Sequence, residues 1–152
     1  MPALPARALH TLRLVRTFEA PRERVFRAWT DPEALKEWYG PDGWSTPSAE
    51  VDLRAGGGYR ITMKGPEGEE IRLSGTFREV RPPERLVYTW NWEKFHLDLG
   101  GLGETLVTVE FHERGGATEL ILTHERFPRA ETRDLHGGGW ASTLDCLAEY
   151  LG

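Results

Sequence analysis

Several residue types that specialised proteins depend on are scarce or missing in this sequence. Its 152 residues include one cysteine, Cys146, so neither an internal disulfide framework nor a cysteine-based metal site is expected. The chain has no apolar run near the roughly 20 residues that span a bilayer, and its first residues lack the apolar core of a signal peptide. We therefore expect a cytoplasmic protein that does not insert into membranes.

Side-chain amides and lysines are scarce as well. Asn91 is the only amide, glutamine is absent, and only Lys36, Lys64 and Lys94 are lysines among 19 basic residues. Depletion of thermolabile amides is typical of thermophiles, and a GC-rich genome would add to the same bias. The composition therefore predicts a thermophilic source.

Positive charge is too sparse and too scattered for a nucleic-acid partner. The formal net charge is −5 and the isoelectric point is about 5.6, which also argues against binding to anionic membranes. With 39% hydrophobic and 28% charged residues, the chain has the composition of an ordinary folded protein. Its length indicates a single domain over residues 1–152, with residues 1–8 as a flexible N-terminal tail.

Hydrophobic periodicity predicts one strand, two short helices, about six further strands and a long terminal helix. Residues 10–18 alternate between apolar and polar side chains, as a strand does. Pro21 and Pro32 are typical first residues of helices, and Asp31 is the expected N-cap of the second one. From there the period changes to two, and alternation predicts strands over residues 49–53, 59–63, 71–77, 86–92, 105–111 and 118–124.

The beginning of the terminal helix is ambiguous. Its apolar stripe consists of Trp140, Leu144, Leu147, Ala148 and Leu151. Gly137, Gly138 and Gly139 precede this stripe, and each glycine inside a helix costs about 1 kcal/mol relative to alanine. Either the regular helix begins near Trp140, or the glycines allow close approach to a strand or a ligand.

This order of elements predicts an α+β fold. Consecutive hairpins imply an antiparallel sheet, and a single long amphipathic helix can cover only one of its faces. A strongly curved sheet of about six to seven strands that wraps around the helix is the simplest arrangement that buries the apolar faces of both. It leaves a space between the helix and the concave face.

The sequence resembles the activator of heat-shock protein 90 ATPase homologue family, a member of the START-like (SRPBCC) superfamily of helix-grip, or Bet v 1-like, domains. The resemblance is carried, in order along the chain, by residues 20–32, 38–41, 52–57, 83–90 and 139–151. It implies the helix-grip fold and an internal cavity for a hydrophobic small molecule. The superfamily includes lipid and steroid carriers, hormone receptors, aromatase/cyclases and ring-hydroxylase subunits. The co-chaperones that name the family carry a further N-terminal chaperone-binding domain, for which this chain has no room.

Aromatic residues are the most informative candidates for a site. Tyr88, Trp90 and Trp92 share one face of a predicted strand, where a concave sheet would turn them toward the terminal helix. The alternative is a completely filled aromatic core. The residues expected to contact a ligand are Trp38, Met63, Phe77, Tyr88, Trp90, Trp92, Val107, Val109, His124, His136, Trp140 and Leu144.

Two histidines supply the candidate polar chemistry. His124 ends an inward strand face and His136 precedes Trp140 by one helical turn, so they form a potential pair at the cavity mouth that orients a ligand or moves a proton. The alternative is a pair of hydrogen-bonded structural residues. Glu125 lies beside His124, but the spacing matches no zinc motif, so no metal and no cofactor are expected.

Two other features are ambiguous. Arg16 falls on the apolar face of the first strand, where burial would require an acidic partner such as Glu79 or Glu110, whereas exposure at the sheet edge is the simpler account. The segment Glu93–Gly103 is glycine-rich and predicts a mobile lid beside the cavity.

Three functions fit this sequence. The first is a carrier or sensor that binds a lipid-like or aromatic molecule as a monomer or weak homodimer. The second is a small cyclase, dehydratase or hydrolase that uses the same cavity, and the third is a module that contacts a chaperone. No paired carboxylates, triad or cofactor fingerprint is present, which favours binding over catalysis.

Overall fold

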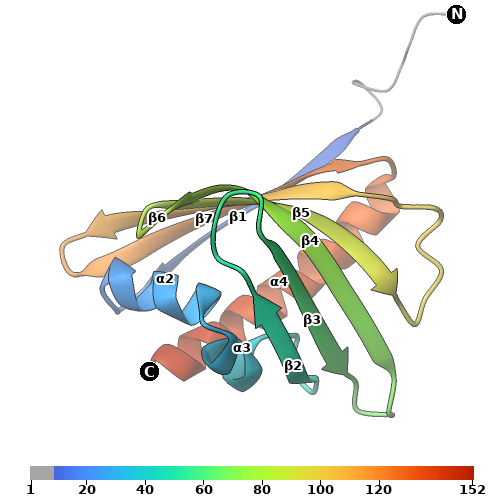
Figure 1. Ribbon diagram of the computed structural model, residues 1–152, viewed down its shortest axis with the longest axis horizontal. Coiled ribbons are helices and arrows are strands. Elements are labelled where there is room, and N and C mark those ends of the chain that lie inside the picture. The colour runs from blue at the N-terminus through green and yellow to red at the C-terminus, as the bar shows by residue number, and fades with distance from the viewer. Residues whose placement is uncertain (1–8) are drawn as a thin grey trace, which may run out of the picture.

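The computed structural model describes residues 9–152, so the expected tail over residues 1–8 lies outside the described part of the chain. Figure 1 shows the order of the elements. They are β1 (His10–Phe18), α2 (Arg22–Thr30), α3 (Pro32–Trp38), β2 (Ser45–Val51), β3 (Gly58–Lys64), β4 (Glu70–Arg81), β5 (Arg85–Lys94), β6 (Thr105–Arg114), β7 (Ala117–Phe127) and α4 (Ala130–Leu151).

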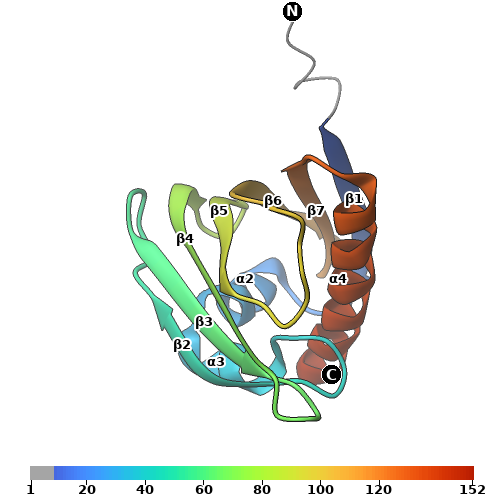
Figure 2. The ribbon, with the colours of Figure 1, turned by 90° about the vertical axis from the view of Figure 1, so that its right-hand side faces the viewer.

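The strands form one antiparallel sheet that curves around α4. Within the described residues the sheet has seven strands in the order β1-β7-β6-β5-β4-β3-β2. Figure 2 shows the sheet as an arc, with α4 along its open side and with α2 and α3 at one end. The predicted helix-grip fold is therefore confirmed.

Local sequence explains how α3 begins and how it is held against α2. The carboxylate of Asp31 accepts a hydrogen bond from the backbone N–H of Glu33 at 3.0 Å, which confirms it as the N-cap of α3. Pro32 is the first residue of that helix, where its missing N–H costs nothing. Trp38, the last residue of α3, donates its indole N–H to the carbonyl of Ala28 in α2 at 2.9 Å. The two helices are thereby fixed against each other.

Helix α4 is longer than its apolar stripe indicates. It begins at Ala130 and runs unbroken through Gly137, Gly138 and Gly139, so the alternative of a start near Trp140 is wrong. Packing against the sheet outweighs the glycine cost, as tertiary contacts commonly do for amphipathic helices. A Cβ at Gly137 would lie 3.3 Å from Leu12 of β1, so this glycine does allow close approach to a strand.

Arg16 has a partner that the sequence does not predict. Its Nη1 lies 2.7 Å from Oδ1 of Asp145 on α4, instead of near Glu79 or Glu110. Those two glutamates belong to β4 and β6, whereas α4 runs along β1 and brings its own carboxylate to the strand. The ion pair is partly exposed at the sheet edge.

In the described part of the chain, none of the helices is long and apolar enough for a bilayer crossing. Residues 9–152 also contain no group of three or more acidic, histidine or cysteine side chains that could hold a metal ion.

Candidate ligand cavity

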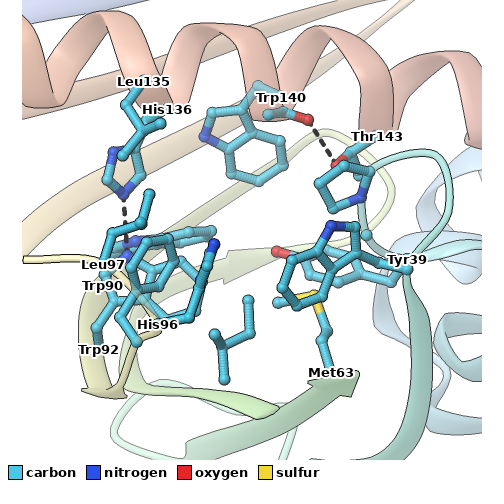
Figure 3. A pocket seen from close by; sticks show the side chains of 16 residues that line it. Tyr39, Met63, Trp90, Trp92, His96, Leu97, Leu135, His136, Trp140 and Thr143 are labelled. Atoms are coloured by element: carbon cyan, nitrogen blue, oxygen red, sulfur yellow. Dashed lines mark hydrogen bonds between the residues drawn. The ribbon is translucent and has the colours of Figure 1, made fainter. Parts of the chain in front are cut away.

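A cavity of about 230 Å³ lies between α4 and the concave side of β3, β4 and β5 (Figure 3). Trp90 and Trp92 of β5 form one wall, Met63 of β3 forms another, and His136 and Trp140 of α4 form the roof. All five are among the residues expected to contact a ligand. The loop that follows α3 and the loop that follows β5 complete the enclosure.

The other expected residues lie elsewhere. Phe77 and Tyr88 line a second, much smaller void of about 20 Å³. Five expected residues line neither void: Trp38, Val107, Val109, His124 and Leu144. Trp38 packs on Trp29 at a ring-centroid distance of 5.3 Å and belongs to the filled part of the core. The interior is therefore hollow at one end and filled at the other.

The tryptophans of the cavity hold one another in place. The rings of Trp90 and Trp140 lie 5.1 Å apart between centroids, and Trp90 meets Trp92 edge to face at 5.4 Å. Because aromatic rings prefer such tilted contacts, each indole restrains its neighbours without filling the space that they surround. The result is a rigid aromatic wall.

Hydrogen bonds from two indoles reach the two histidines. The indole N–H of Trp92 donates to Nε2 of His136 at 2.9 Å, and the other ring nitrogen of His136 donates to the carbonyl of Thr132 at 2.8 Å. The indole N–H of Trp140 donates to Nδ1 of His124 at 3.0 Å. Each histidine accepts a hydrogen bond from an indole, so each carries its proton on the opposite nitrogen.

His124 is fully buried behind the wall. Its Nε2 carries the proton and lies 2.7 Å from the hydroxyl of Thr105, which completes its hydrogen bonding. Burial lowers the pKa of His124 well below its usual value, and the neighbouring His136 lowers it further. Burial also lowers the pKa of His136. Both side chains are therefore neutral near pH 7, and protonation would oppose the indole donors.

The expected histidine pair exists, but only one member reaches the cavity. The rings of His124 and His136 lie 5.4 Å apart, and His136 lines the cavity whereas His124 does not. Trp140 covers His124 from the helix side. Both ring nitrogens of each histidine are engaged, which is the arrangement of structural residues.

The mouth of the cavity is formed by Trp44 and His96, whose rings lie 5.2 Å apart between centroids. Trp44 belongs to the loop after α3 and is half-buried, whereas His96 belongs to the loop after β5 and is exposed. The second loop starts at Phe95, because Glu93 and Lys94 continue β5. The segment predicted as a lid does lie beside the cavity, and its mobility stays a prediction.

The polar groups that reach the cavity are few. Within the described part of the chain, no aspartate, glutamate, lysine or arginine lines it. The hydroxyl of Thr143 donates to the carbonyl of Gly139 in the preceding turn of α4 at 2.7 Å. The hydroxyl of Tyr39 faces the cavity (Figure 3). The site is thus a mainly apolar cavity, and the hydroxyl of Tyr39 that faces it makes no hydrogen bond to the described part of the protein.

Several residues that line the cavity are not among those expected to contact a ligand. The loops contribute Tyr39, Gly40, Pro41, Trp44, Phe95, His96 and Leu97, α4 contributes Leu135, Gly139 and Thr143, and β4 contributes Ile71. Tyr39 directly follows the last residue of α3 and has extended backbone dihedrals, so helical spacing says nothing about its direction. Ile71 alone stands on a predicted inward strand face, and alternation along β4 could have indicated it.

Known proteins resemble this chain in sequence and in fold. The family model described as "Activator of Hsp90 ATPase homolog 1-like protein" matches residues 19–152. The structure is similar to that of the AHSA1 protein from Silicibacter pomeroyi, with 32% identity, a TM-score of 0.81 and coverage of 93% of this chain and 97% of that chain. A protein from Chromobacterium violaceum is 31% identical with a TM-score of 0.80, over 93% of this chain and 96% of that chain. Among curated proteins, none matches the sequence.

Proposed function

Because the chain belongs to the activator of Hsp90 ATPase homolog 1-like family, within a superfamily that commonly binds hydrophobic ligands, we propose that it binds an apolar small molecule as a carrier or sensor. The binding site is the cavity between α4 and β3, β4 and β5. The observation that carries this proposal is a partly open hollow of about 230 Å³ that is lined mainly by aromatic and aliphatic side chains.

The energetics of such a site favour apolar ligands. Burial stabilises a complex by about 25 cal/mol for each Å² of apolar surface. A small aromatic molecule that buries roughly 200 Å² would gain about 5 kcal/mol before the cost of lost motion is subtracted. The rigid indole wall limits that cost on the protein side, because Trp90, Trp92 and Trp140 are already ordered by their mutual contacts.

An enzymatic role is a second candidate, and its acid–base residue would be a histidine. It predicts that His124→Ala abolishes turnover while the fold persists. The geometry favours binding, since His124 does not line the cavity and His136 already accepts a hydrogen bond from Trp92. An acid–base role would require one of these hydrogen bonds to break during the reaction.

Contact with a chaperone is the third candidate, and the family description supports it. Such a surface would lie on the exposed sheet or helix and would be insensitive to filling of the cavity. Co-purification with the chaperone, unchanged by a variant that fills the cavity, would favour this function over the first two.

Two glycines of α4 offer a matched test of the proposal. Neither Gly138 nor Gly139 has a heavy atom within 4 Å of an added Cβ, but only Gly139 lines the cavity. A leucine at either position gains helix propensity of about 1 kcal/mol. We expect Gly139→Leu to fill the cavity, whereas Gly138→Leu leaves it open.

The measurement is native mass spectrometry of the purified wild type and of both variants, each after incubation with naphthalene. The wild type and Gly138→Leu should carry one bound molecule, and Gly139→Leu should carry none. Binding to all three proteins would locate the ligand outside the cavity. The wild type as purified, measured alongside, would reveal any molecule that it retains from the cell.

A further inference from the structure

We infer that the cavity selects a neutral, compact aromatic molecule with one hydrogen-bond acceptor, to which the hydroxyl of Tyr39 donates. This inference rests on the proposed function and specifies its ligand class. It follows from four properties of the cavity, which are its unpartnered hydroxyl, its other polar atoms, its size and its lack of charge.

Tyr39 is the buried tyrosine whose hydroxyl has no partner. The side chain is only 6% exposed, and among the described residues no hydrogen bond joins its hydroxyl to the protein. Two other buried tyrosines are satisfied: Tyr59 donates to the carbonyl of Thr89 at 2.6 Å, and Tyr88 accepts from the indole of Trp29 at 3.3 Å. Among the described residues, the buried side-chain atoms without a partner are Nε of Arg22 and Nε1 of Trp90, so the hydroxyl oxygen of Tyr39 is instead accessible from the cavity that its side chain lines.

The position of Tyr39 is fixed while its hydroxyl faces the cavity. Its backbone carbonyl accepts a hydrogen bond from the hydroxyl of Thr46 at 2.7 Å. Its ring meets Trp38 at 5.4 Å and Trp140 at 6.3 Å, both nearly edge to face. Figure 3 shows the hydroxyl oxygen directed into the space between Met63 and the rings of Trp90 and Trp92. A ligand in that space would meet it.

The protonation state makes this hydroxyl a donor. Burial raises the pKa of Tyr39 well above its usual value, and the nearby Tyr88 raises it further. The group is therefore a neutral O–H at physiological pH. It offers a hydrogen bond to a carbonyl, ether or ring nitrogen.

The polar side-chain atoms that α4 and β5 contribute to the wall are unavailable to a ligand, whereas the loop residues Trp44 and His96 also line the cavity with ring nitrogens. The indoles of Trp92 and Trp140 donate to the two histidines, and Thr143 donates within α4. The indole N–H of Trp90 has no partner either, but this atom is buried beneath neighbouring protein atoms. Among the buried side chains of the wall, Tyr39 therefore supplies the polar group that a ligand can reach, because Trp44 is half-buried and His96 is exposed.

The volume limits the size of the ligand. At about 230 Å³ the cavity falls below the roughly 300–1,000 Å³ that is typical of sites for drug-sized molecules. One or two aromatic rings fit, whereas a steroid or a long acyl chain does not fit completely. Flat rings also match walls made of indoles, because offset and edge-to-face contacts add to simple burial.

The absence of charge in the wall restricts the ligand further. Within residues 9–152, no lysine or arginine side chain lines the cavity. A carboxylate would lose its hydration there without gaining a lysine or arginine partner, which is costly in an apolar site. Fatty acids and aromatic acids are therefore disfavoured as ligands.

Isothermal titration calorimetry with four probes tests this inference. Naphthalene has two rings and no acceptor, coumarin has two rings and a carbonyl, naphthoate adds a charge, and palmitate replaces rings with an acyl chain. The proteins are the wild type, Tyr39→Phe, and Tyr59→Phe as a control that removes a buried hydroxyl away from the cavity.

We expect Tyr39→Phe to weaken coumarin binding by about three- to tenfold, the usual effect of one hydrogen bond, and to leave naphthalene binding unchanged. Tyr59→Phe should alter neither. In the wild type, naphthoate should bind at least about tenfold more weakly than naphthalene, since a buried carboxylate without a cation is penalised by more than that factor. This last comparison does not depend on any variant being folded.

Equal coumarin affinity in the wild type and Tyr39→Phe would overturn the role of Tyr39, and tight naphthoate binding would overturn the selection for neutral ligands. Binding of palmitate without binding of either neutral aromatic probe would overturn the ligand class while the proposed function stands. Failure of all four probes to bind would contradict the proposed function itself.

Discussion

The two ends of the interior are built from similar residues and reach opposite outcomes. The packed end, formed by Phe26, Trp29, Trp38 and Phe111, has ring centroids 5.2–6.2 Å apart, and the void beside it is only about 20 Å³. The hollow end, formed by Trp90, Trp92 and Trp140, has rings at similar distances but surrounds about 230 Å³. Aromatic content alone therefore does not decide whether a core is filled.

The covering elements explain this difference. At the packed end, α2 and α3 insert Trp29 and Trp38 between the sheet and α4, as the stacking of Trp29 on Trp140 at 5.9 Å shows. At the hollow end, no helix formed by residues 9–152 takes that place, and two loops meet through Trp44 and His96. Loops deliver fewer inward side chains than an amphipathic helix does, so space remains.

The largest expected effect is a difference in the free energy of unfolding between alanine substitutions at the two ends. Phe111 is 1% exposed in the packed end, so Phe111→Ala should lower the free energy of unfolding by about 3–5 kcal/mol. Phe95 lines the cavity and is half-buried, so Phe95→Ala should cost no more than about 1 kcal/mol. Urea denaturation measures both. Equal losses would show that the cavity wall is packed as tightly as the rest of the core.

Acid should weaken the hollow end selectively. Burial lowers the pKa of His124 and of His136 in the folded state, so the unfolded chain binds protons more readily than the folded one. The contribution of these two histidines to the free energy of unfolding is therefore fully present above about pH 6.5, the ordinary pKa of histidine, and it declines as the pH falls below that value. Each unit of lowered pKa contributes about 1.4 kcal/mol to this loss.

Hydrogen exchange can locate the acid effect. Between about pH 8 and pH 5.5, after correction for intrinsic exchange rates, protection should fall around His136 on α4 and persist in α2. A uniform loss, or a denaturation midpoint that does not change over this range, would contradict the assignment of both histidines as buried and neutral.

The smallest expected effect compares tyrosines from the two ends. Tyr59→Phe leaves the carbonyl of Thr89 without its side-chain donor and should cost about 1 kcal/mol in thermal or chemical unfolding. Tyr39→Phe removes a hydroxyl without a protein partner, so stability should stay the same or rise. A loss for Tyr39→Phe as large as that for Tyr59→Phe would mean that its hydroxyl has a structural role.

Periodicity predicts the strands of this fold better than it predicts the site. Alternation along β5 correctly turns Trp90 and Trp92 to the same side, and helical spacing correctly turns His136 and Trp140 toward them. His124 is also correctly placed on the concave face. Sequence spacing cannot show that Trp140 of α4 covers it, because the two residues are 16 positions apart and lie in different elements that only the tertiary fold brings together.

The contacts of individual loop residues could not be predicted for a different reason, although the segment Glu93–Gly103 was expected beside the cavity. Trp44 and His96 have no regular backbone period, so nothing in their spacing indicates that they meet at the mouth. Tyr39 lies just past a helix end, where the extended backbone redirects its side chain. The loop residues that line the cavity are thus those whose contacts periodicity does not predict.

The methyl group of Met63 offers the most direct test of whether a ligand occupies the hollow end. Met63 lines the cavity, so selective carbon-13 labelling of methionine methyl groups places a probe in its wall. On titration with naphthalene, ring currents should shift the Met63 methyl resonance saturably. A Met63 resonance that stays in place while calorimetry reports binding would contradict occupation of the cavity.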